Sequence, residues 1–508
     1  MNIASLFGKA AQRFAEQTAL RDLETGETLS FAVLPEAFGR VANQLAANGI
    51  HHGDRVALLG GSNVDYLICD YAIMAAGRVR VPLDPSLSMA EQVAQLIDSN
   101  ARMLICEPDQ WARGVELAKQ INGLAIMEPR TARSGEQDGQ PPRSSFGHNL
   151  NEEDLASLSY TGGTTGMPKA VMITHGSLCA ALQNIVLARN MSPGDTMLNV
   201  RPAWPIAAIV VLAHLAAGGT VLMTDQFEPA RFLEQLQTHH VAATSLVPTH
   251  LARLMDEAER YRFEFPALRV MEIGAAAIPS DLFRRVLARF GPRVGIIYGL
   301  TEAPWSCYMP PAAFDCAPEE QVKRMRQVGR PLFGVEIAIR LPDGSLAGAG
   351  EAGEVTLRGR HITPGYWQRP ELTAAVIRDG WFHTGDLGVI DQAGYLAITG
   401  RIKELIRSGG KSVVPAEVEA AMRSHSAVMD VAVLGLPDKE WGEIVVAAVV
   451  VHPESRSETD EQQLIDWCRE RLSGFKKPRR VYLMDEIPRS HYGKVLRSSL
   501  LNRIAQYS

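Results

Sequence analysis

The segment Ser159–Lys169 reads SYTGGTTGMPK and is the most informative stretch of the chain. Positions 161–166 hold three glycines and three threonines, and a lysine ends the segment. Such a run offers exposed backbone N–H groups, hydroxyl donors and room for close approach, and the lysine adds positive charge, which together suit a polyphosphate. The same composition also occurs in ordinary surface turns, so segments further along the chain must decide between the two interpretations.

A Walker phosphate loop, GxxxxGK[ST], is the obvious rival interpretation, and it fails here. Met167 and Pro168 occupy the positions where its second glycine would fall. Lys169 is followed by Ala170, so the hydroxyl that a Walker loop gives to magnesium is missing. The segment therefore predicts a different kind of phosphate-binding loop.

The segment resembles the [YF]TSGTTGxPKG signature of the adenylate-forming superfamily, which includes acyl-CoA synthetases, luciferases and adenylation domains of nonribosomal peptide synthetases. Gly163 stands where the signature has serine and Ala170 where it has its last glycine, which weakens one phosphate contact at most. The resemblance implies that ATP activates a carboxylic acid as an acyl-AMP, with release of pyrophosphate. The loop residues that it implies as phosphate contacts are Thr161, Gly162, Gly163, Thr164, Thr165, Gly166 and Lys169.

Two further segments resemble the adenine and magnesium elements of the same superfamily. Tyr298–Glu302, YGLTE, follows the strand-like residues 294–297. The resemblance implies that the Tyr298 ring stacks on adenine and that Glu302 holds Mg²⁺, since a hard cation prefers carboxylate and phosphate oxygens. An isolated glutamate would otherwise be an ordinary loop carboxylate. The remaining nucleotide contacts that these elements imply are Gly299 and Thr301, with Thr301 and Glu302 in the catalytic set, and the small residues Gly274, Ala275 and Ala276 against the adenine.

The ribose and hinge elements come next along the chain. Trp381–Asp386, WFHTGD, resembles [YW]xTGD, whose Asp binds the ribose hydroxyls, although an Asp after Gly is also a routine turn residue. In Gly400–Glu404, GRIKE, Arg401 corresponds to an arginine that contacts ribose and phosphate. Lys403 falls on the hinge position of the superfamily, and its alternative is a plain surface lysine.

Pro488–Val495, PRSHYGKV, resembles the P[KR]xxxGK element that places the catalytic lysine, here Lys494. A lone lysine in a polar tail is usually solvated, but its spacing after Gly493, behind four other matched elements, favours catalysis. A substrate carboxylate is already ionised at pH 7, so the reaction needs no protein nucleophile. The task of Lys494 would be to reach the acid and the α-phosphate of ATP and to stabilise the developing charge.

Coenzyme A is the expected acceptor of the acyl group. Ser408, Gly409 and Gly410 suit a loop that passes close to a ligand, in relatives the pantetheine tunnel. Residues 436–442, LPDKEWG, resemble the segment that offers a tryptophan to the coenzyme in aromatic acyl-CoA ligases, the group that the chain is most similar to. Residues 475–480, FKKPRR, are basic, as a 3′-phospho-ADP group requires. A core tryptophan and a solvated basic run are the alternatives. The side chains expected at the coenzyme are Trp441, Phe475, Lys477 and Arg479.

The acid pocket is less clearly marked. Relatives often carry an aromatic-His pair after a proline, and here Trp204 and Pro205 occupy those positions, so the gating histidine is missing. Trp204 could line a pocket for a flat acid, although a tryptophan among Pro and Ala is more often simply packed. Further expected lining residues are His250 and Ala303. We expect a medium-sized aromatic or cyclic acid.

Apolar runs alternate with helical patterns over residues 30–300, which predicts an α/β fold with parallel sheets covered by helices. The expected strands are Val79–Leu83, Met103–Cys106, Thr220–Thr224, Ala242–Val247 and Arg269–Ile273, and the expected helical segments include Phe232–Thr238 and Asp281–Phe290. Residues 129–149 are rich in Pro, Gly, Ser and charge and predict an exposed connector.

The end of the chain predicts a separate small α+β unit. Val428–Leu434 and Ile444–Val451 are strand-like, and an amphipathic helix lies between Asp460 and Gly474, with Leu464, Cys468 and Leu472 on one face. We expect a large N-terminal domain, residues 1–402, that binds ATP and the acid and includes a β-barrel-like part. A mobile C-terminal domain, residues 403–508, would carry the catalytic lysine.

Bulk properties limit the other partners. A chain of 508 residues with a net charge of −6 gives no reason to expect binding to nucleic acid. The six cysteines show no metal-ligand spacing and suit reduced thiols in the cytoplasm. The N-terminus has an amphipathic pattern, with Phe7, Ala11 and Phe14 on one face, and no signal-peptide features. No run of 18 or more apolar residues predicts a membrane span, and a homodimer is possible.

Three other functions remain open from the sequence. An amide-forming ligase would transfer the acyl group to an amine, and the unusual pocket segment keeps that alternative open. A stand-alone adenylation enzyme would load the thiol of a carrier protein. A non-enzymatic nucleotide sensor is disfavoured, because a binder has no need of Lys494.

Overall fold

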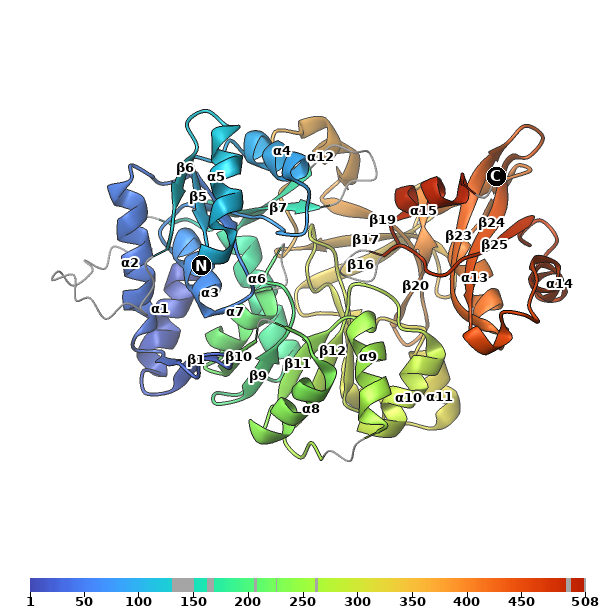
Figure 1. The fold of residues 1–508 in the computed structure, drawn as a ribbon, viewed down its shortest axis with the longest axis horizontal. Coiled ribbons are helices and arrows are strands. Elements are labelled where there is room, and N and C mark those ends of the chain that lie inside the picture. Colours follow the sequence, from blue (N-terminus) through green and yellow to red (C-terminus); the bar gives the residue numbers. More distant parts are fainter. Residues whose placement is uncertain are drawn as a thin grey trace.

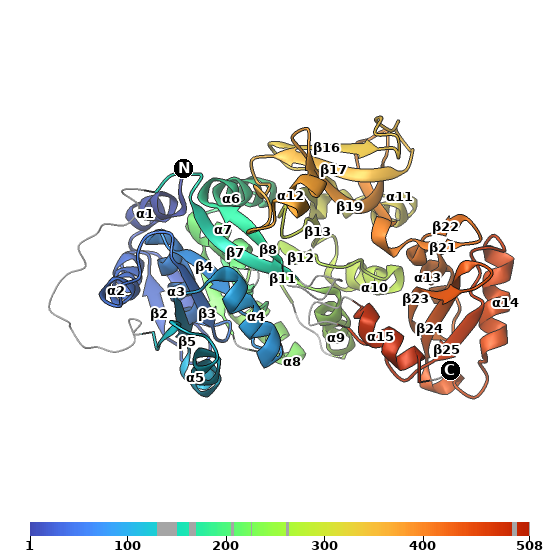
Figure 2. The same cartoon turned by 90° about the horizontal axis from the view of Figure 1, so that it is seen from above.

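The computed structural model of the protein describes residues 1–129, 150–161, 169–204, 208–224, 226–260, 264–489 and 495–506. Figure 1 shows a large body and, at one end of it, a smaller unit formed by the C-terminal part of the chain. Figure 2 shows from above that this unit stands beside the large body, so that the two meet along one side. Within the described ranges the strands form four sheets.

The first sheet is the widest and has the order β15-β14-β13-β12-β11-β9-β10-β1-β2. Its strands are β1 (Thr18–Asp22), β2 (Thr28–Ser30), β9 (Thr196–Asn199), β10 (Thr220–Met223), β11 (Ala243–Leu246), β12 (Val270–Ile273), β13 (Val294–Tyr298), β14 (Cys307–Met309) and β15 (Arg330–Pro331). Strands β1 and β9–β13 pair in parallel, and β2, β14 and β15 add antiparallel edges. Every residue of β11 and β12 is buried, as expected of parallel strands covered on both faces.

The second sheet has the order β6-β5-β3-β4-β7-β8. Its strands are β3 (Arg55–Leu59), β4 (Val79–Pro82), β5 (Met103–Cys106), β6 (Ala125–Met127), β7 (Leu155–Thr161) and β8 (Lys169–Thr174). The pairs are parallel except for β7 and β8, which run antiparallel on either side of residues 162–168.

Helices cover both faces of these two sheets. One apolar cluster joins the sheets to the helices between them, which are α1 (Ile3–Arg13), α2 (Leu34–Ala47), α3 (Val64–Ala75), α6 (His175–Arg189) and α7 (Ala208–Ala216). The outer face of the first sheet is covered by α8 (Pro229–Thr238), α9 (Pro248–Ala258) and α10 (Ser280–Phe290). The outer face of the second sheet is covered by α4 (Met89–Ser99) and α5 (Trp111–Lys119). Shorter helical segments are η1 (Pro108–Gln110), η2 (Pro311–Phe314) and α11 (Pro318–Arg324).

The third sheet is antiparallel and carries the chain toward the C-terminal unit. Its elements are β16 (Val335–Arg340), β17 (Gly353–Gly359), β18 (Ile377–Arg378), β19 (Trp381–Ile390) and β20 (Leu396–Arg401), with α12 (Pro370–Val376) before β18. It stands in the place of the expected β-barrel-like part. Its apolar side packs against Tyr298, which ties it to the edge of the first sheet.

The fourth sheet forms the C-terminal unit. Its elements are η3 (Ile402–Glu404), β21 (Ile406–Ser408), β22 (Lys411–Val413), α13 (Pro415–Arg423), β23 (Val428–Asp438), β24 (Gly442–Val451), η4 (Pro453–Ser455), α14 (Glu461–Arg471), β25 (Arg480–Leu483) and α15 (Arg497–Ile504). Helices α13 and α14 pack on one face of the sheet and α15 on the other.

The α/β class and the five expected buried strands are confirmed, with strand ends that differ by one residue at most. One local prediction was wrong. The helix α14 is capped by Asp460, as expected, but it ends at Arg471, and Leu472 is already extended, so Leu472 does not lie on the helical face. In α1 Phe7 is buried and Ala11, four residues further on, is partly buried, and Ala10 is a further buried residue beside them. Most of the expected connector, residues 130–149, lies outside the described residues.

All six cysteines lie within the described ranges as free thiols, and only Cys316 is partly accessible. Within those ranges no helix combines the length and the apolar character that crossing a membrane would demand. The described part of the chain also holds no group of three or more His, Cys, Asp or Glu side chains arranged for a metal ion.

Candidate active site

The first polar cluster joins the end of β13 to the third sheet. The Tyr298 hydroxyl donates to Asp386 Oδ2 at 2.7 Å, and Arg401 Nε lies 2.7 Å from Asp386 Oδ1. Asp386 and Arg401 are register partners in β19 and β20. The carboxylate is only 2% exposed, and burial together with this carboxylate raises the pKa of Tyr298 well above its usual range. Tyr298 is therefore a neutral hydrogen-bond donor. Tyr298, Asp386 and Arg401, each predicted from its own segment of the sequence, thus meet in one cluster.

The backbone around Asp386 fixes the direction of its side chain. Gly385 has a φ of 70°, a conformation that glycine adopts without strain. Its N–H donates to Glu354 Oε1 at 3.1 Å, and the Asp386 N–H donates to Thr384 Oγ1 at 3.0 Å. These bonds make a turn inside a strand, which explains why a Gly-Asp pair that looks like a loop lies within β19.

The second cluster gathers around Glu302. Lys169 Nζ lies 3.4 Å from Glu302 Oε1 and 3.1 Å from the Tyr366 hydroxyl, and that hydroxyl donates to the same Oε1 at 2.8 Å. Lys169 Nζ also lies 4.4 Å from the centre of the Tyr366 ring. Glu302 is buried and Lys169 is partly exposed, so a buried carboxylate and an accessible ammonium group share one tyrosine.

Thr161 and Lys169 enclose the expected phosphate loop. They pair across β7 and β8, and the buried Thr161 hydroxyl has no hydrogen-bond partner among the described residues. The loop residues Gly162, Gly163, Thr164, Thr165 and Gly166 lie outside the described residues, as do Lys494 and Pro205. Lys169, which follows the loop, lies beside Glu302.

Small residues line the carboxyl end of β12. Gly274 follows the strand, and Ala275 and Ala276 are exposed. Ala275 has a φ of 72°, which is strained for a residue with a Cβ and marks the turn as locally constrained. At Gly299 an added Cβ would lie 2.5 Å from the Trp305 nitrogen, so only glycine fits that tight turn.

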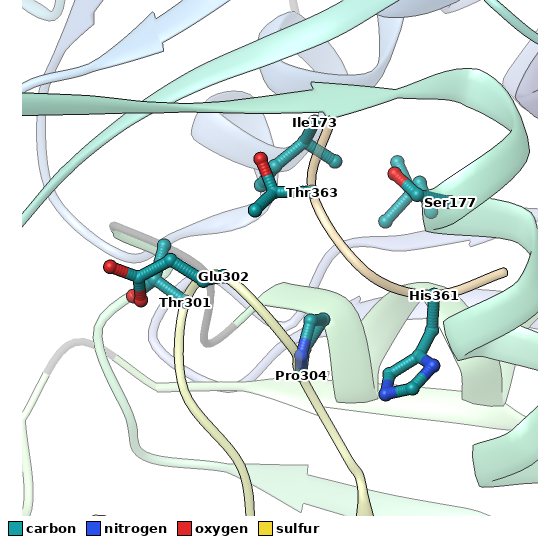
Figure 3. Close-up of a pocket in the computed structure, with 8 residues that line it drawn as sticks. Ile173, Ser177, Thr301, Glu302, Pro304, His361 and Thr363 are labelled. Carbon is teal, nitrogen blue, oxygen red and sulfur yellow. The ribbon is translucent and has the colours of Figure 1, made fainter. Parts of the chain in front are cut away.

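A small cavity lies behind Thr301 and Glu302. Its volume of about 10 Å³ suits roughly one water molecule, and its wall includes Ser177, His361 and Thr363. In Figure 3 the Glu302 carboxylate points away from His361, toward the other side of its loop. His361 is 1% exposed, and burial lowers its pKa from 6.5 to about 4.

The residues expected to line the acid pocket are not brought together in the same way. Trp204 packs with its ring centre 5.8 Å from that of Tyr66, in the cluster between the two large sheets. His250 is buried and stacks on Phe227 at 4.4 Å, a ring that packs against the cluster on the outer face of the first sheet. Ala303 is fully buried and packs beside Tyr298. These three side chains sit in separate packing environments.

Residues expected at coenzyme A form two groups on the C-terminal unit. Gly409 has a φ of 56°, its N–H donates to the Trp441 carbonyl at 2.9 Å, and an added Cβ would lie 2.8 Å from the Trp441 ring. The Arg479 guanidinium lies 4.1 Å from the centre of the same ring. Ser408 is buried, and Gly410 has a φ of 76°. This first group therefore combines a glycine turn, an indole and a cation.

The second group surrounds Phe475, whose ring centre lies 4.6 Å from Lys411 Nζ and 5.7 Å from Lys476 Nζ. Lys477 is half-buried beside it. Lys411 was missed by the sequence analysis because it lies 64 residues from Phe475 and carries no motif of its own.

The chain passes between the two parts of the molecule at Lys403. This exposed residue lies in η3, after β20 of the third sheet and before β21 of the fourth. Glu404, its neighbour, pairs with Arg497 of α15 at 3.0 Å. Arg489 and Val495, which flank the segment that contains Lys494, form an isolated β-bridge with each other. Arg489 also donates to both carboxylate oxygens of Asp430. Both flanks of the Lys494 segment are thus anchored on the C-terminal unit.

Tyr366 is the main residue that the sequence analysis missed in the second cluster. Its segment, Pro364-Gly365-Tyr366-Trp367, carries a Pro-Gly pair that signals a turn, and two aromatic residues follow. Nothing in the sequence places it next to Glu302, because the two residues lie 64 positions apart.

Comparisons with known proteins agree with one another. The family model described as "AMP-binding enzyme" matches residues 7–367, and the model "AMP-binding enzyme C-terminal domain" matches residues 417–494. The chain is 34% identical over 500 residues to a feruloyl-CoA synthase of Amycolatopsis, covering 97% of each chain. It is 33% identical to a 2-succinylbenzoate–CoA ligase of Geobacillus kaustophilus, covering 93% of this chain and 92% of the other.

Solved structures give the same picture. ATP-bound MatB from Rhodopseudomonas palustris superposes with a TM-score of 0.89 at 28% identity, with 99% of each chain covered. The amide bond synthetase McbA from Marinactinospora thermotolerans superposes with a TM-score of 0.87 at 26% identity, also with 99% of each chain covered.

Proposed function

The chain belongs to the family of AMP-binding enzymes, and from this premise we propose that it is an AMP-forming acid–thiol ligase. It activates a carboxylic acid with ATP as an acyl-AMP, releases pyrophosphate, and transfers the acyl group to coenzyme A. The observation that carries the proposal is the meeting of Tyr298, Asp386 and Arg401, since a buried carboxylate with two bound donors is suited to hold the two hydroxyls of a ribose.

In the proposed nucleotide site, the adenine lies between the Tyr298 ring and the turn of Gly274, Ala275 and Ala276. Small side chains let a planar ring approach the backbone. Arg401 would contact ribose and the α-phosphate, and its half-exposed position at the edge of the cluster supports this role. Gly299 and Thr301 complete the wall on the side of β13.

The phosphates lie along the loop between Thr161 and Lys169. The buried hydroxyl of Thr161, which has no partner among the described residues, fits a phosphate oxygen acceptor. Lys169 is held next to Glu302, and this ion pair would orient its positive charge for the β- and γ-phosphates.

Mg²⁺ fits the residues present, because Glu302 offers a buried carboxylate at the phosphate end of the site. Glu302 would be its one protein ligand, and phosphate oxygens would supply others. When bound, the ion screens the charge of the triphosphate and helps pyrophosphate to leave.

We assign the chemistry of the first step to Lys494, which would bring positive charge to the acid and the α-phosphate. The division into residues 1–402 and 403–508, with Lys403 as the pivot, is part of the same proposal. A rotation about η3 would withdraw Lys494 after adenylation and bring the C-terminal unit's coenzyme groups to the acyl-AMP. The exposed position of Lys403 between two separate sheets supports this role.

For the second substrate, the turn of Ser408, Gly409 and Gly410 against Trp441 would guide the pantetheine arm. Arg479, Lys477 and the cations around Phe475 would bind the 3′-phospho-ADP group, since guanidinium and ammonium groups recognise phosphates. The free thiols support a reducing compartment such as the cytoplasm.

For the acid we propose a medium-sized aromatic or cyclic carboxylic acid. Trp204 supports this choice, because it is an aromatic side chain in the segment that follows the carboxyl end of β9, and ligands of parallel sheets bind near such ends. The names of the feruloyl-CoA and 2-succinylbenzoate–CoA relatives point in the same direction.

A second candidate function is amide formation from the acyl-AMP. It is favoured by Pro205, which replaces the expected gating histidine, and by the structural likeness to the amide bond synthetase McbA. Loading of a carrier-protein thiol is the third.

The test is a pyrophosphate-release screen over carboxylic acids, with acyl products identified by mass spectrometry. Each acid is assayed with coenzyme A, with an amine mixture and with a phosphopantetheinylated carrier protein. Acyl-CoA formed faster than any other product supports the proposal. Acyl amides formed without coenzyme A, at a rate that the coenzyme does not raise, would make the enzyme an amide ligase instead.

A further inference from the structure

Residues 361–366, which we name the brace, lie beside the loop 299–306 and hold it at three points. The Thr363 N–H donates to the Glu302 carbonyl at 2.8 Å. The Tyr366 hydroxyl donates to Glu302 Oε1 at 2.8 Å, and His361 Nε2 lies 3.0 Å from Ser306 Oγ. Figure 3 shows His361 and Thr363 on one segment of chain, facing the segment that carries Thr301, Glu302 and Pro304.

The direction of the bond between His361 and Ser306 follows from the proton count. Ser306 Oγ donates its single proton to the Ala303 carbonyl at 2.9 Å, so it must accept a proton from His361. The neutral ring therefore carries its proton on Nε2. Its Nδ1 atom, which has no hydrogen-bond partner among the described residues, is left as an acceptor in a buried position. A chain of two aligned bonds thus runs from His361 through Ser306 to Ala303, next to Glu302.

The brace is also tied to the strand that begins with Lys169. Val171 and Tyr366 form a bridge, the Met172 N–H donates to the Gly365 carbonyl at 3.0 Å, and Thr363 Oγ1 donates to the Met172 carbonyl at 2.7 Å. The lysine at the end of the phosphate loop and the carboxylate of Glu302 therefore depend on one support.

Tyr366 fixes the orientation of the Glu302 carboxylate. The tyrosine is 5% exposed, and its hydroxyl proton is directed at Glu302 Oε1 at 2.8 Å. A hydroxyl that occupies Oε1 restrains rotation of the carboxylate and leaves Oε2 for another partner. A charge-assisted bond of this kind contributes more than a neutral one.

We propose that Tyr366 and His361 are positioning residues for magnesium: the brace holds Glu302 so that its second oxygen faces the ion and the phosphates. The proposal rests on the proposed role of Glu302 as the magnesium ligand. It predicts that loss of a brace contact lowers the affinity for ATP in the presence of Mg²⁺ and leaves the affinity for ATP without Mg²⁺ unchanged.

The test measures equilibrium binding of ATP by calorimetry without any acid, so that no reaction takes place. The dissociation constant is measured in excess Mg²⁺ and in EDTA, and the ratio of the second value to the first gives the contribution of the ion. Tyr366→Phe should lower this ratio about 10-fold, the equivalent of one charge-assisted hydrogen bond. His361→Ala should lower it about threefold, and His361→Gln, whose amide can donate to Ser306, should restore it.

Two matched variants control for the loss of a buried side chain elsewhere. Tyr71→Phe removes a buried hydroxyl that donates to the Ile3 carbonyl at 3.1 Å. His214→Gln replaces a buried histidine whose Nε2 lies 2.8 Å from the Asp195 carbonyl. Both should leave the ratio at the wild-type value, and melting temperatures identify any variant that fails to fold.

The outcomes separate the two proposals. If wild-type protein binds ATP more tightly with Mg²⁺ and Tyr366→Phe keeps the same ratio as Tyr71→Phe, the brace has no role at the ion and this inference is wrong. If wild-type protein does not bind ATP, or binds it equally with and without Mg²⁺, the proposed role of Glu302 as magnesium ligand is itself wrong.

Discussion

The nucleotide end of the candidate site and its acid end differ in how their residues are brought together. At the nucleotide end, polar residues from segments far apart in the chain meet within hydrogen-bond distance: Tyr298 with Asp386, and Lys169 with Glu302. At the acid end, Trp204 and His250 lie in separate apolar clusters, each packed on its own aromatic neighbour.

The difference follows from the ligands. ATP presents the same ribose and phosphates to every enzyme that uses it, so the residues that bind it must be of fixed types at fixed spacing. A carboxylic acid is recognised beyond its carboxylate mainly by shape, and packing residues that define a shape carry no motif. The predictions below test whether the two ends differ in this way, from the largest expected effect to the smallest.

Lys494→Ala should lower the rate of acyl-AMP formation by about 10³-fold or more, because an oriented cation at developing phosphate charge is a large catalytic contribution. Thioester formation from supplied acyl-AMP should continue at a rate near that of wild type. Both half-reactions can be followed separately by pyrophosphate release and by acyl-CoA formation. Lys119→Ala, at an exposed lysine that pairs with Glu116 on α5, is the control. Equal loss in both steps would refute the assigned role.

Asp386→Asn should weaken ATP binding roughly 100-fold, because an amide is a poorer acceptor for two ribose hydroxyls and each charge-assisted bond contributes about 1.5–3 kcal/mol. The affinity for the acid should stay within about twofold, because the two ends bind separate groups. Calorimetry with ATP gives the first value, and the dependence of pyrophosphate release on acid concentration gives the second. Asp391→Asn, at a carboxylate that accepts from Gln327 and Tyr395 beyond the end of β19, should change neither. An equal loss of acid affinity would show that the two ends are not separable.

The same contrast sets the limit of what the sequence could predict. The buried strands β5, β11 and β12 were predictable because apolar runs of that length fit parallel strands. Tyr298, Asp386 and Arg401 were found because each lies in its own short motif. Tyr366 and His361 were not found, since their partners lie 64 and 55 residues away and only the fold brings them together. The helix α14 was extended too far at Leu472, because an apolar residue at the right spacing does not show where a helix ends.

The buried histidine behind Glu302 predicts a pH effect on stability. Burial lowers the pKa of His361 from 6.5 to about 4, so below pH 6.5 the unfolded chain takes up a proton that the folded chain does not. This proton uptake favours the unfolded chain; the resulting loss of folding stability is absent above pH 7 and grows as the pH falls toward 4. Wild-type protein should therefore lose about 2 kcal/mol more than His361→Gln between pH 7 and pH 4.5.

Thermal melts of both proteins across this range measure the effect. His175 and His214, whose pKa values burial lowers to about 4 and about 3, titrate identically in both proteins and cancel. If the melting temperatures of the two proteins fall in parallel, His361 is not held neutral, and the unprotonated state assigned to its Nδ1 atom is wrong.

Trp204→Ala should have the smallest effect and should act only at the acid end. A pocket that loses part of its wall changes discrimination between acids by about 1–3 kcal/mol, so the preferred acid should lose about 10-fold in kcat/KM while larger acids gain. The KM for ATP should not change, because Trp204 packs on Tyr66 in a different apolar cluster from Tyr298, the tyrosine that donates to Asp386. Pyrophosphate release over a series of acids of increasing size measures this, with Trp467→Ala on α14 as the control for removal of an indole. A uniform loss of kcat/KM for every acid, accompanied by a lower melting temperature, would mean that Trp204 has only a packing role. The acid would then have to be recognised by other residues, none of which the sequence marks by an aromatic side chain.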